Sequence, residues 1–158
     1  MYIALLANAM DKDKEKVVHP SYVEIIKKMN RLDALLFERL TSTDGYVKAI
    51  NPRIVVGDSS KYLVGVLPEW YLGWKIDGYD EFDISASLVR MSKFGIIDLM
   101  FKETVKNASY NELLHSPYIN KVLEYNKKLM HNDLLKVNSV SSVVYVNEYG
   151  RQFREACH

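Results

Sequence analysis

Five side chains that could bind a metal ion lie close together near the start of the chain, in MDKDKEKVVHPSYVEI (residues 10–25). Four of them are acidic and one is a histidine: Asp11, Asp13, Glu15, His19 and Glu24. Carboxylates bind calcium and magnesium, and histidine binds zinc, so the spacing has to be compared with known metal sites. The alternative is a solvated loop that leads into a helix.

The spacing matches neither kind of metal site. An EF-hand loop that starts at Asp11 requires glycine at its sixth position and glutamate at its twelfth, where this chain has Lys16 and Tyr22. A zinc site requires clustered histidine and cysteine, and His19 has no such neighbour in the sequence. Lysines alternate with the acidic residues, which is typical of a solvated segment. We therefore predict no metal site, and a local hydrogen bond of His19 near a helix start.

No other stretch carries a catalytic motif. The chain has no G-x-S-x-G motif and no phosphate-binding P-loop. Cys157 and His158 are adjacent in a predicted helix, where neighbouring side chains point apart, so they do not form a nucleophile with its base. His115 and His131 stand alone, and we expect both at the surface or at helix caps. The sequence predicts a protein that is not an enzyme and that has no cofactor.

The composition fits one globular domain. Of 158 residues, 48% are hydrophobic and 26% are charged, and the net charge is +1, which does not indicate an acidic partner. The single cysteine, Cys157, cannot form an internal disulfide, and we predict that it is buried and that the protein is cytoplasmic. The start of the chain lacks the basic region of a signal peptide, and its apolar run is too short to cross a bilayer, so we expect no membrane contact.

Apolar residues at helical spacing predict three helices in the first third of the chain. The first covers residues 2–10, and its uncapped start leads us to expect the C-terminal part of a longer protein. The second begins at Pro20, where Ser21 and Glu24 have the spacing of a capping box. The third is capped by Asn30. Its apolar stripe consists of Leu32, Leu35, Leu36 and Leu40.

The remainder of the chain mixes strands and helices. Short strands are predicted at residues 54–57 and 62–67, and a third at residues 140–146. Helices are predicted at residues 83–94, ended by Gly95, at residues 117–130, and after a cap at Asn147. The aromatic residues Trp70, Tyr71 and Trp74 are expected in the core, with a partly exposed patch as the alternative.

This order of elements is typical of a winged helix: a helix, a second helix with the exit FGIID, a strand and a closing helix. About forty residues separate that exit from the last strand, too many for a simple wing. We therefore predict a mainly α fold with a small β component (α+β) and a winged-helix-like core with an inserted helical hairpin. Residues 1–158 form a single domain, with N-terminal helices in 1–29, a winged-helix-like region in 30–158 and the insertion at about 99–139. The residues expected to be buried are Ile25, Ile26, Leu36, Leu88, Met91, Ile96, Val144 and Phe153.

Four stretches resemble the C-terminal part of the bacterial family called abortive infection alpha, a domain family of unknown function. They are LLANAMD (5–11), HPSYVEIIKKMNRLDALLFERL (19–40), SLVRMSKFGIID (87–98) and the closing element NEYGRQFREAC (147–157). Family members usually carry a longer N-terminal region, and they have threonine where this chain has the cap Asn147. The resemblance implies a link to bacterial defence against phage. It implies no reaction and no catalytic residue.

The winged-helix order also raises the question of nucleic-acid binding. The second helix offers Arg90 and Lys93 as contacts, but the acidic residues just before and at its start would repel phosphate. These are Asp77, Asp80, Glu81 and Asp83. We therefore predict a non-enzymatic interaction or sensing module with a protein partner. The alternative is a nucleic-acid-binding regulator that uses Arg90 and Lys93, and self-association stays open.

Overall fold

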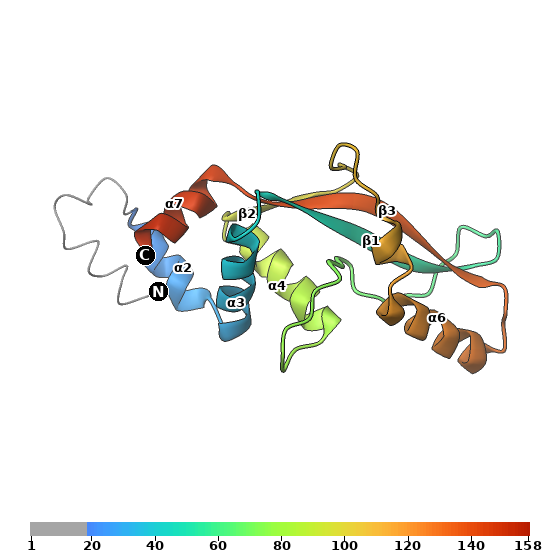
Figure 1. The fold of residues 1–158 in the computed structure, drawn as a ribbon. Coiled ribbons are helices and arrows are strands. Elements are labelled where there is room, and N and C mark those ends of the chain that lie inside the picture. The colour runs from blue at the N-terminus through green and yellow to red at the C-terminus, as the bar shows by residue number, and fades with distance from the viewer. Residues whose placement is uncertain (1–18) are drawn as a thin grey trace. The chain divides into compact units, whose positions relative to one another are not determined.

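The structure is a computed structural model that describes residues 19–158 (Figure 1). The predicted helix at residues 2–10 and the acidic residues Asp11, Asp13 and Glu15 lie outside this part. The elements, in chain order, are α2 (Ser21–Lys28), α3 (Arg31–Thr41), β1 (Tyr46–Val56), α4 (Glu81–Lys93), β2 (Ile97–Met100), α5 (Asn111–Leu114), α6 (Pro117–Met130), β3 (Leu135–Val146) and α7 (Glu148–Ala156). The predicted α+β class is confirmed.

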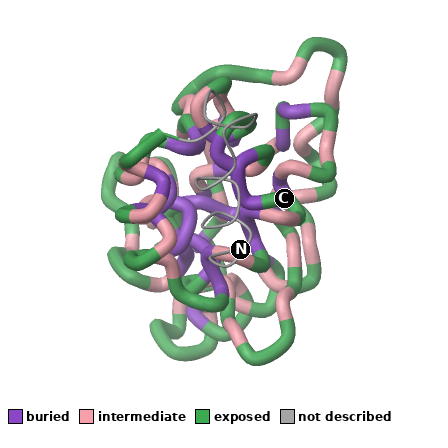
Figure 2. The backbone as a smooth tube through the Cα atoms, turned by 90° about the vertical axis from the view of Figure 1, so that its left-hand side faces the viewer, coloured by how far each residue is buried: buried purple, intermediate pink, exposed green. Residues whose placement is uncertain are grey.

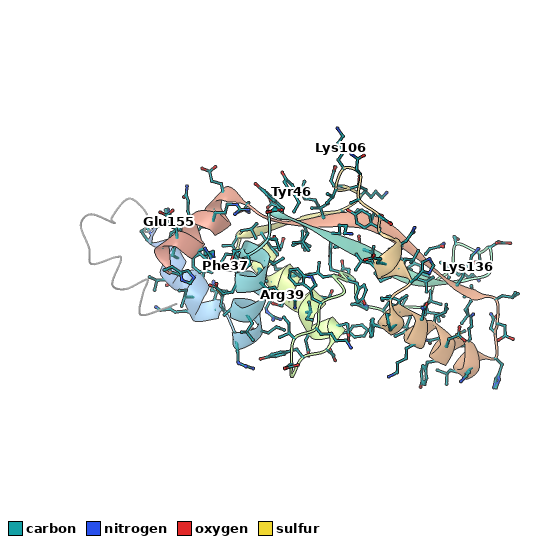
Figure 3. The ribbon with its side chains drawn as sticks, viewed as in Figure 1. Phe37, Arg39, Tyr46, Lys106, Lys136 and Glu155 are labelled. Atoms are coloured by element: carbon teal, nitrogen blue, oxygen red, sulfur yellow. The ribbon has the colours of Figure 1, made fainter. Side chains whose placement is uncertain are left out.

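The three strands form a small sheet in the order β1-β3-β2. Side-chain contacts show that β1 and β3 are antiparallel, because partners that rise in number along β1 fall in number along β3. Tyr46 stacks on Tyr145, Asn51 bonds to Ser142, and Asp58 pairs with Lys136 (Figure 3). Contacts from Asp98 to Asn147 and from Lys102 to Ser142 give the same antiparallel direction for β2 and β3.

One predicted strand is absent from the described chain. Residues 54–56 belong to β1, but residues 62–67 form only an isolated bridge from Val55 to Tyr62. The chain turns sharply after β1. The returning segment pairs with the end of β1 through two backbone hydrogen bonds, from Val56 N to Lys61 O and from Leu63 N to Ile54 O. The predicted strand at residues 140–146 is the second half of β3.

Helix caps explain several of the helix bounds. Asn30 caps α3 as predicted, and Asp33 completes its capping box. Asn147 caps α7 through a hydrogen bond from Gly150 N to its Oδ1. The capping box predicted from Ser21 and Glu24 is wrong, because Ser21 is already the first helical residue of α2.

The predicted ends of the later helices are close to the observed ones. Helix α6 has its predicted bounds, and Gly95 has the left-handed φ of +82° that a helix end requires. His115 and His131 are the C-caps of α5 and α6, and both are exposed, as expected. Within residues 19–158, no helix combines the length and the apolar character of a membrane span.

The described chain divides into two compact units. The first contains residues 19–46, 87–99 and 145–158, and the second contains residues 47–86 and 100–144. Strands β1 and β3 and helix α4 contribute residues to both.

Packed aromatic rings form the core of the first unit. The ring centroid of Phe153 lies 5.4 Å from that of Tyr22 and 5.6 Å from that of Phe37. Phe37 is labelled in Figure 3. The residues predicted to be buried are so, except for Ile26, which is half-buried because Tyr22 and Ile25 occupy the inner side of the short α2. On α3, Leu35 of the predicted stripe is exposed, and Phe37, which was not part of that stripe, is buried.

Aliphatic side chains from strands and helices form the core of the second unit. Ile50 and Ile54 of β1 pack with Leu135 of β3 and Ile119 of α6, which lies along this part of the sheet (Figure 1). Buried positions are purple in Figure 2. The segment after the turn returns to β1 at Tyr71, whose backbone N and O bond to Ile50 at 3.0 Å each. Trp70 and Tyr71 are buried as predicted, and Trp74 is half-buried.

Candidate functional site

The two residues predicted to contact a partner lie on α4, within the first unit. The guanidinium of Arg90 pairs with the carboxylate of Asp33, with Nη2 at 2.8 Å and Nε at 3.2 Å from Oδ1. Ser87 Oγ donates to the same oxygen at 2.6 Å. Asp33 is fully buried, whereas Lys93 is exposed. Arg90 therefore joins α4 to α3, and contact of either residue with a partner stays a prediction.

The sequence contains a signal for this pairing. Asp33 stands between Leu32 and Leu36, on the side of α3 that the apolar stripe assigns to the core. A carboxylate on a buried face needs a cationic or hydrogen-bonding partner. That requirement predicts a partner for Asp33, although it does not identify Arg90, which lies far away in the sequence.

His19 makes the local hydrogen bond that was predicted for it. Its Nδ1 lies 2.7 Å from Ser21 Oγ and accepts from Ser21 N at 3.2 Å, and Ser21 Oγ also bonds to the hydroxyl of Tyr149. The ring of His19 contacts the rings of Tyr22 and Tyr149. Within residues 19–158, no group of three or more His, Cys, Asp or Glu side chains is arranged to hold a metal ion.

The adjacent Cys157 and His158 lie in different environments. Cys157 is buried, and burial raises the pKa of its thiol to about 11, with a smaller contribution from Glu38. His158 is exposed, and its Nε2 lies 2.8 Å from Glu38 Oε1. A thiol with this pKa is protonated near neutral pH and is not a reactive nucleophile.

A groove in the second unit is the candidate functional site. Its volume is about 1080 Å³, and it lies between α6, the start of α4, the segment of residues 66–75 and the first residues of β1. The volume is near the upper end of the roughly 300–1,000 Å³ typical of small-molecule pockets. Five aromatic residues line it: Tyr71, Trp74, Phe82, Tyr118 and Tyr125.

Two of these rings form a stacked pair on the groove wall. The ring centroids of Tyr71 and Tyr118 are 5.5 Å apart, with an interplanar angle of 26°. The hydroxyl of Tyr71 lies 2.8 Å from the Oγ of Ser116, the cap residue of α6. Because Ser116 also accepts from Ile119 N, the start of α6 fixes the position of this pair.

Both phenols of the pair stay neutral over the physiological pH range. Burial raises the pKa of Tyr118 to about 12, with smaller contributions from the charges of Glu81 and Asp80. Burial also raises the pKa of Tyr71, against a hydrogen bond from Ser116 that lowers it, and Glu81 adds to the increase.

The rim of the groove is apolar and accessible. Phe82 is 42% exposed, Tyr125 64% and Leu129 62%. Tyr118, Val122 and Leu123 of α6 pack against the core cluster that contains Ile119, whereas Tyr125 and Leu129 are exposed. The apolar side of α6 therefore extends from the core of the second unit to the accessible rim of the groove.

One buried polar side chain lies in the lining. Asn126 is 5% exposed, and its Nδ2 donates to Val122 O at 2.8 Å. Charged side chains of both signs also line the groove: Glu81, Glu112, Lys48, Lys75 and Lys121. The Nζ of Lys48 donates to Ser109 O at 2.9 Å, so its ammonium is directed to a residue outside the lining.

The sequence predicts the aromatic residues of the 66–75 segment as core and does not predict the groove. The signal that could have indicated it is the width of the apolar side of α6, which extends beyond the core-facing residues to Tyr125 and Leu129. The groove requires Tyr71 and Tyr118 to meet, and their separation in the sequence gives no hint of this contact.

Comparison with known proteins gives one match. The family model described as abortive infection alpha matches residues 1–157, which is essentially the whole chain and not just a C-terminal part. No curated protein and no solved structure matches the chain.

Proposed function

The chain belongs to the abortive infection alpha family, and from this premise we propose that it is a non-enzymatic interaction or sensing module in phage defence. In this proposal it acts in the cytoplasm and binds a protein partner through the groove of the second unit. The observation that carries the proposal is the accessible apolar rim formed by Phe82, Tyr125 and Leu129 around a concave aromatic lining.

Large apolar side chains gathered around a concavity favour a binding role. Protein interfaces are enriched in aromatic residues, and their strongest contacts place a side chain of one protein in a pocket of the other. Exposed apolar residues scattered singly need no explanation, but these three line one groove. Tyr125 and Leu129, two exposed apolar residues of α6 in the groove lining, are one helical turn apart and form one contact surface.

The ionisable groups described above favour binding over catalysis. The phenols of Tyr71 and Tyr118 and the thiol of Cys157 have raised pKa values, so near neutral pH none of them is an anionic nucleophile or base. Their neutral forms suit hydrogen bonding and apolar contact with a partner.

A pair of leucine substitutions tests the proposal. Leu129→Glu places a charge on the groove rim, whereas Leu134→Glu does so at a 75% exposed leucine outside the lining. In cells that produce the whole protein and are challenged with phage, we expect Leu129→Glu to lose protection and Leu134→Glu to keep it. A photo-crosslinker at residue 129 should capture a partner that one at residue 134 does not. Equal protection and capture with both variants would contradict the proposal.

Nucleic-acid binding through α4 is the second candidate function. It uses the winged-helix-like arrangement predicted from the sequence, and Lys93 is exposed on that helix. The Arg90 side chain is 38% exposed although it is paired with Asp33. Fluorescence anisotropy with labelled duplex DNA and RNA at low and near-physiological salt tests it, and Lys93→Ala should reduce the salt slope by about one unit. A slope that Lys93→Ala leaves unchanged would remove this candidate.

A further inference from the structure

The middle strand of the sheet is much longer than one of its two neighbours. Strand β3 has 12 residues, whereas β2, which pairs with it on one side, has four. We infer that the part of this edge that β2 leaves open, residues 135–141, pairs with the same segment of a second copy of the chain. The two segments run antiparallel, so that one sheet continues from copy to copy. This surface is separate from the groove, and the inference goes beyond the proposed function.

The short length of β2 leaves the backbone of this segment unpaired on one side. Strand β2 ends at Met100, and two residues later Lys102 N donates to Ser142 Oγ, so β2 pairs only with the part of β3 that follows Ser142. Within residues 19–158, residues 135–141 form no isolated bridge, and no loop backbone or side chain hydrogen-bonds to their backbone N or O. The nearest such contact is on Ser142 O, which accepts from the hydroxyl of Tyr110. The backbone groups that face away from β1 therefore lack a protein partner.

The residues of this edge do not block pairing. Open edges template the addition of another strand, and proteins protect them with proline, bulges or charged side chains. The segment LKVNSVS (135–141) has no proline and no glycine, and its one charge, Lys136, pairs with Asp58, which follows β1. Val137 packs against the core of the second unit, whereas Asn138 is exposed. The core therefore holds an accessible strand in a conformation that suits pairing.

The open edge is complementary to itself, which favours a second copy over a strand of another protein. A two-fold axis through Asn138, the middle residue of the segment, pairs all of its residues at once. In this register Lys136 lies opposite Val140 of the second copy, and the rest of the segment is uncharged. The two Lys136 residues are then roughly 14 Å apart along the strands, beyond the Debye length of about 8 Å at physiological salt. No like charges oppose each other, and one contact pairs the unpaired groups of both copies.

Charge substitutions on the two-fold axis give a matched test. The full chain should dimerise in sedimentation equilibrium with a Kd of roughly 100 μM. Asn138→Lys and Asn138→Asp should each weaken dimerisation by about fivefold, because the axis places like charges directly opposite each other. An equal mixture of the two variants should recover the association, because the charges are then of opposite sign. Asn120→Lys, which changes an exposed residue of α6, is the control and should leave the Kd unchanged.

Amide hydrogen exchange locates the contact on the sheet. Alternate amides of a strand that is paired on one side face the open edge. Those of residues 135–141 should exchange readily at about 10 μM protein and be protected at about 1 mM, where the dimer dominates. A chain that stays monomeric at the higher concentration, or a mixture of Asn138→Lys and Asn138→Asp that associates no better than either variant alone, would overturn the inference. Neither result bears on the groove, so the proposed function would still be judged by the Leu129→Glu experiment.

Discussion

Asp33 is a single buried carboxylate that determines the role of Arg90. A charge without contact to solvent is costly unless it is paired and hydrogen-bonded, and here Arg90, Ser87 and the backbone N of Asn30 all donate to it. The pair is asymmetric, because the Arg90 side chain is 38% exposed and Asp33 is fully buried. Removal of Arg90 leaves the buried carboxylate of Asp33 without its cationic partner. Removal of Asp33 leaves the guanidinium of Arg90, which water can reach.

We therefore predict that Arg90→Ala destabilises the protein. The cost should be roughly 2–3 kcal/mol, below the roughly 3–5 kcal/mol of a fully buried pair, because Arg90 is partly exposed. Lys93→Ala on the same helix is the control, and its effect should stay within about 0.5 kcal/mol. The measurement is urea unfolding followed by circular dichroism. Equal stability of the two variants would show that the pair contributes nothing.

The raised pKa of Tyr118 gives a second prediction at this scale. The folded protein holds the phenolic proton up to about pH 12, whereas an unfolded tyrosine releases it near pH 10. The folded state therefore binds this proton more tightly, so the stabilisation is fully present below about pH 10 and is lost as the pH rises from about 10 to 12.

Spectrophotometric titration of the phenols checks this. Tyr118→Phe should remove one late-titrating phenol and make stability fall less steeply over that alkaline interval. Tyr125→Phe, which removes a 64% exposed phenol from the groove rim, should leave the late step in place. A late step of the same size in Tyr118→Phe and in the unaltered protein would contradict the assignment.

At the scale of elements, the helices were largely predictable because their signals are local. Asn30, Gly95, Pro117 and Asn147 mark ends through the conformation of a few neighbouring residues, and all four occupy the predicted places. The strand at residues 62–67 was mispredicted because its apolar character is local, whereas pairing depends on a distant partner.

Gly150 shows a constraint between elements that composition does not reveal. It lies inside α7, where glycine costs about 1 kcal/mol relative to alanine. A Cβ at this position would lie 2.0 Å from Ile96 O and 3.0 Å from Val146 Cγ1. The helix therefore approaches the backbone at the exit of α4 so closely that only glycine fits.

We predict that Gly150→Ala destabilises the protein by about 3 kcal/mol or more, because a backbone atom at 2.0 Å cannot move aside. Gly57→Ala is the matched control. Its Cβ would meet nothing within 4 Å, but its φ of +58° is left-handed, so a cost of roughly 1–2 kcal/mol is expected. Thermal unfolding of both variants measures the difference. A tolerated Gly150→Ala would contradict the close approach.

At the scale of the whole molecule, each of the two units contains a natural probe of unfolding that the other lacks. Both tryptophans, Trp70 and Trp74, belong to the second unit, and the single cysteine, Cys157, belongs to the first. Cys157 is 2% exposed, so a thiol reagent reaches it only when the first unit opens. Tryptophan fluorescence and thiol labelling therefore report different parts of the same chain without any added label.

We predict that the two probes show one transition in urea. Helix α4 is divided between the two units at Ser87, and a continuous helix does not lose half of its hydrogen bonds without weakening the other half. Tryptophan fluorescence and Cys157 labelling should therefore share a midpoint, and Arg90→Ala in the first unit should lower both together. Separate midpoints, or a shift of the labelling transition alone, would show that the units unfold independently.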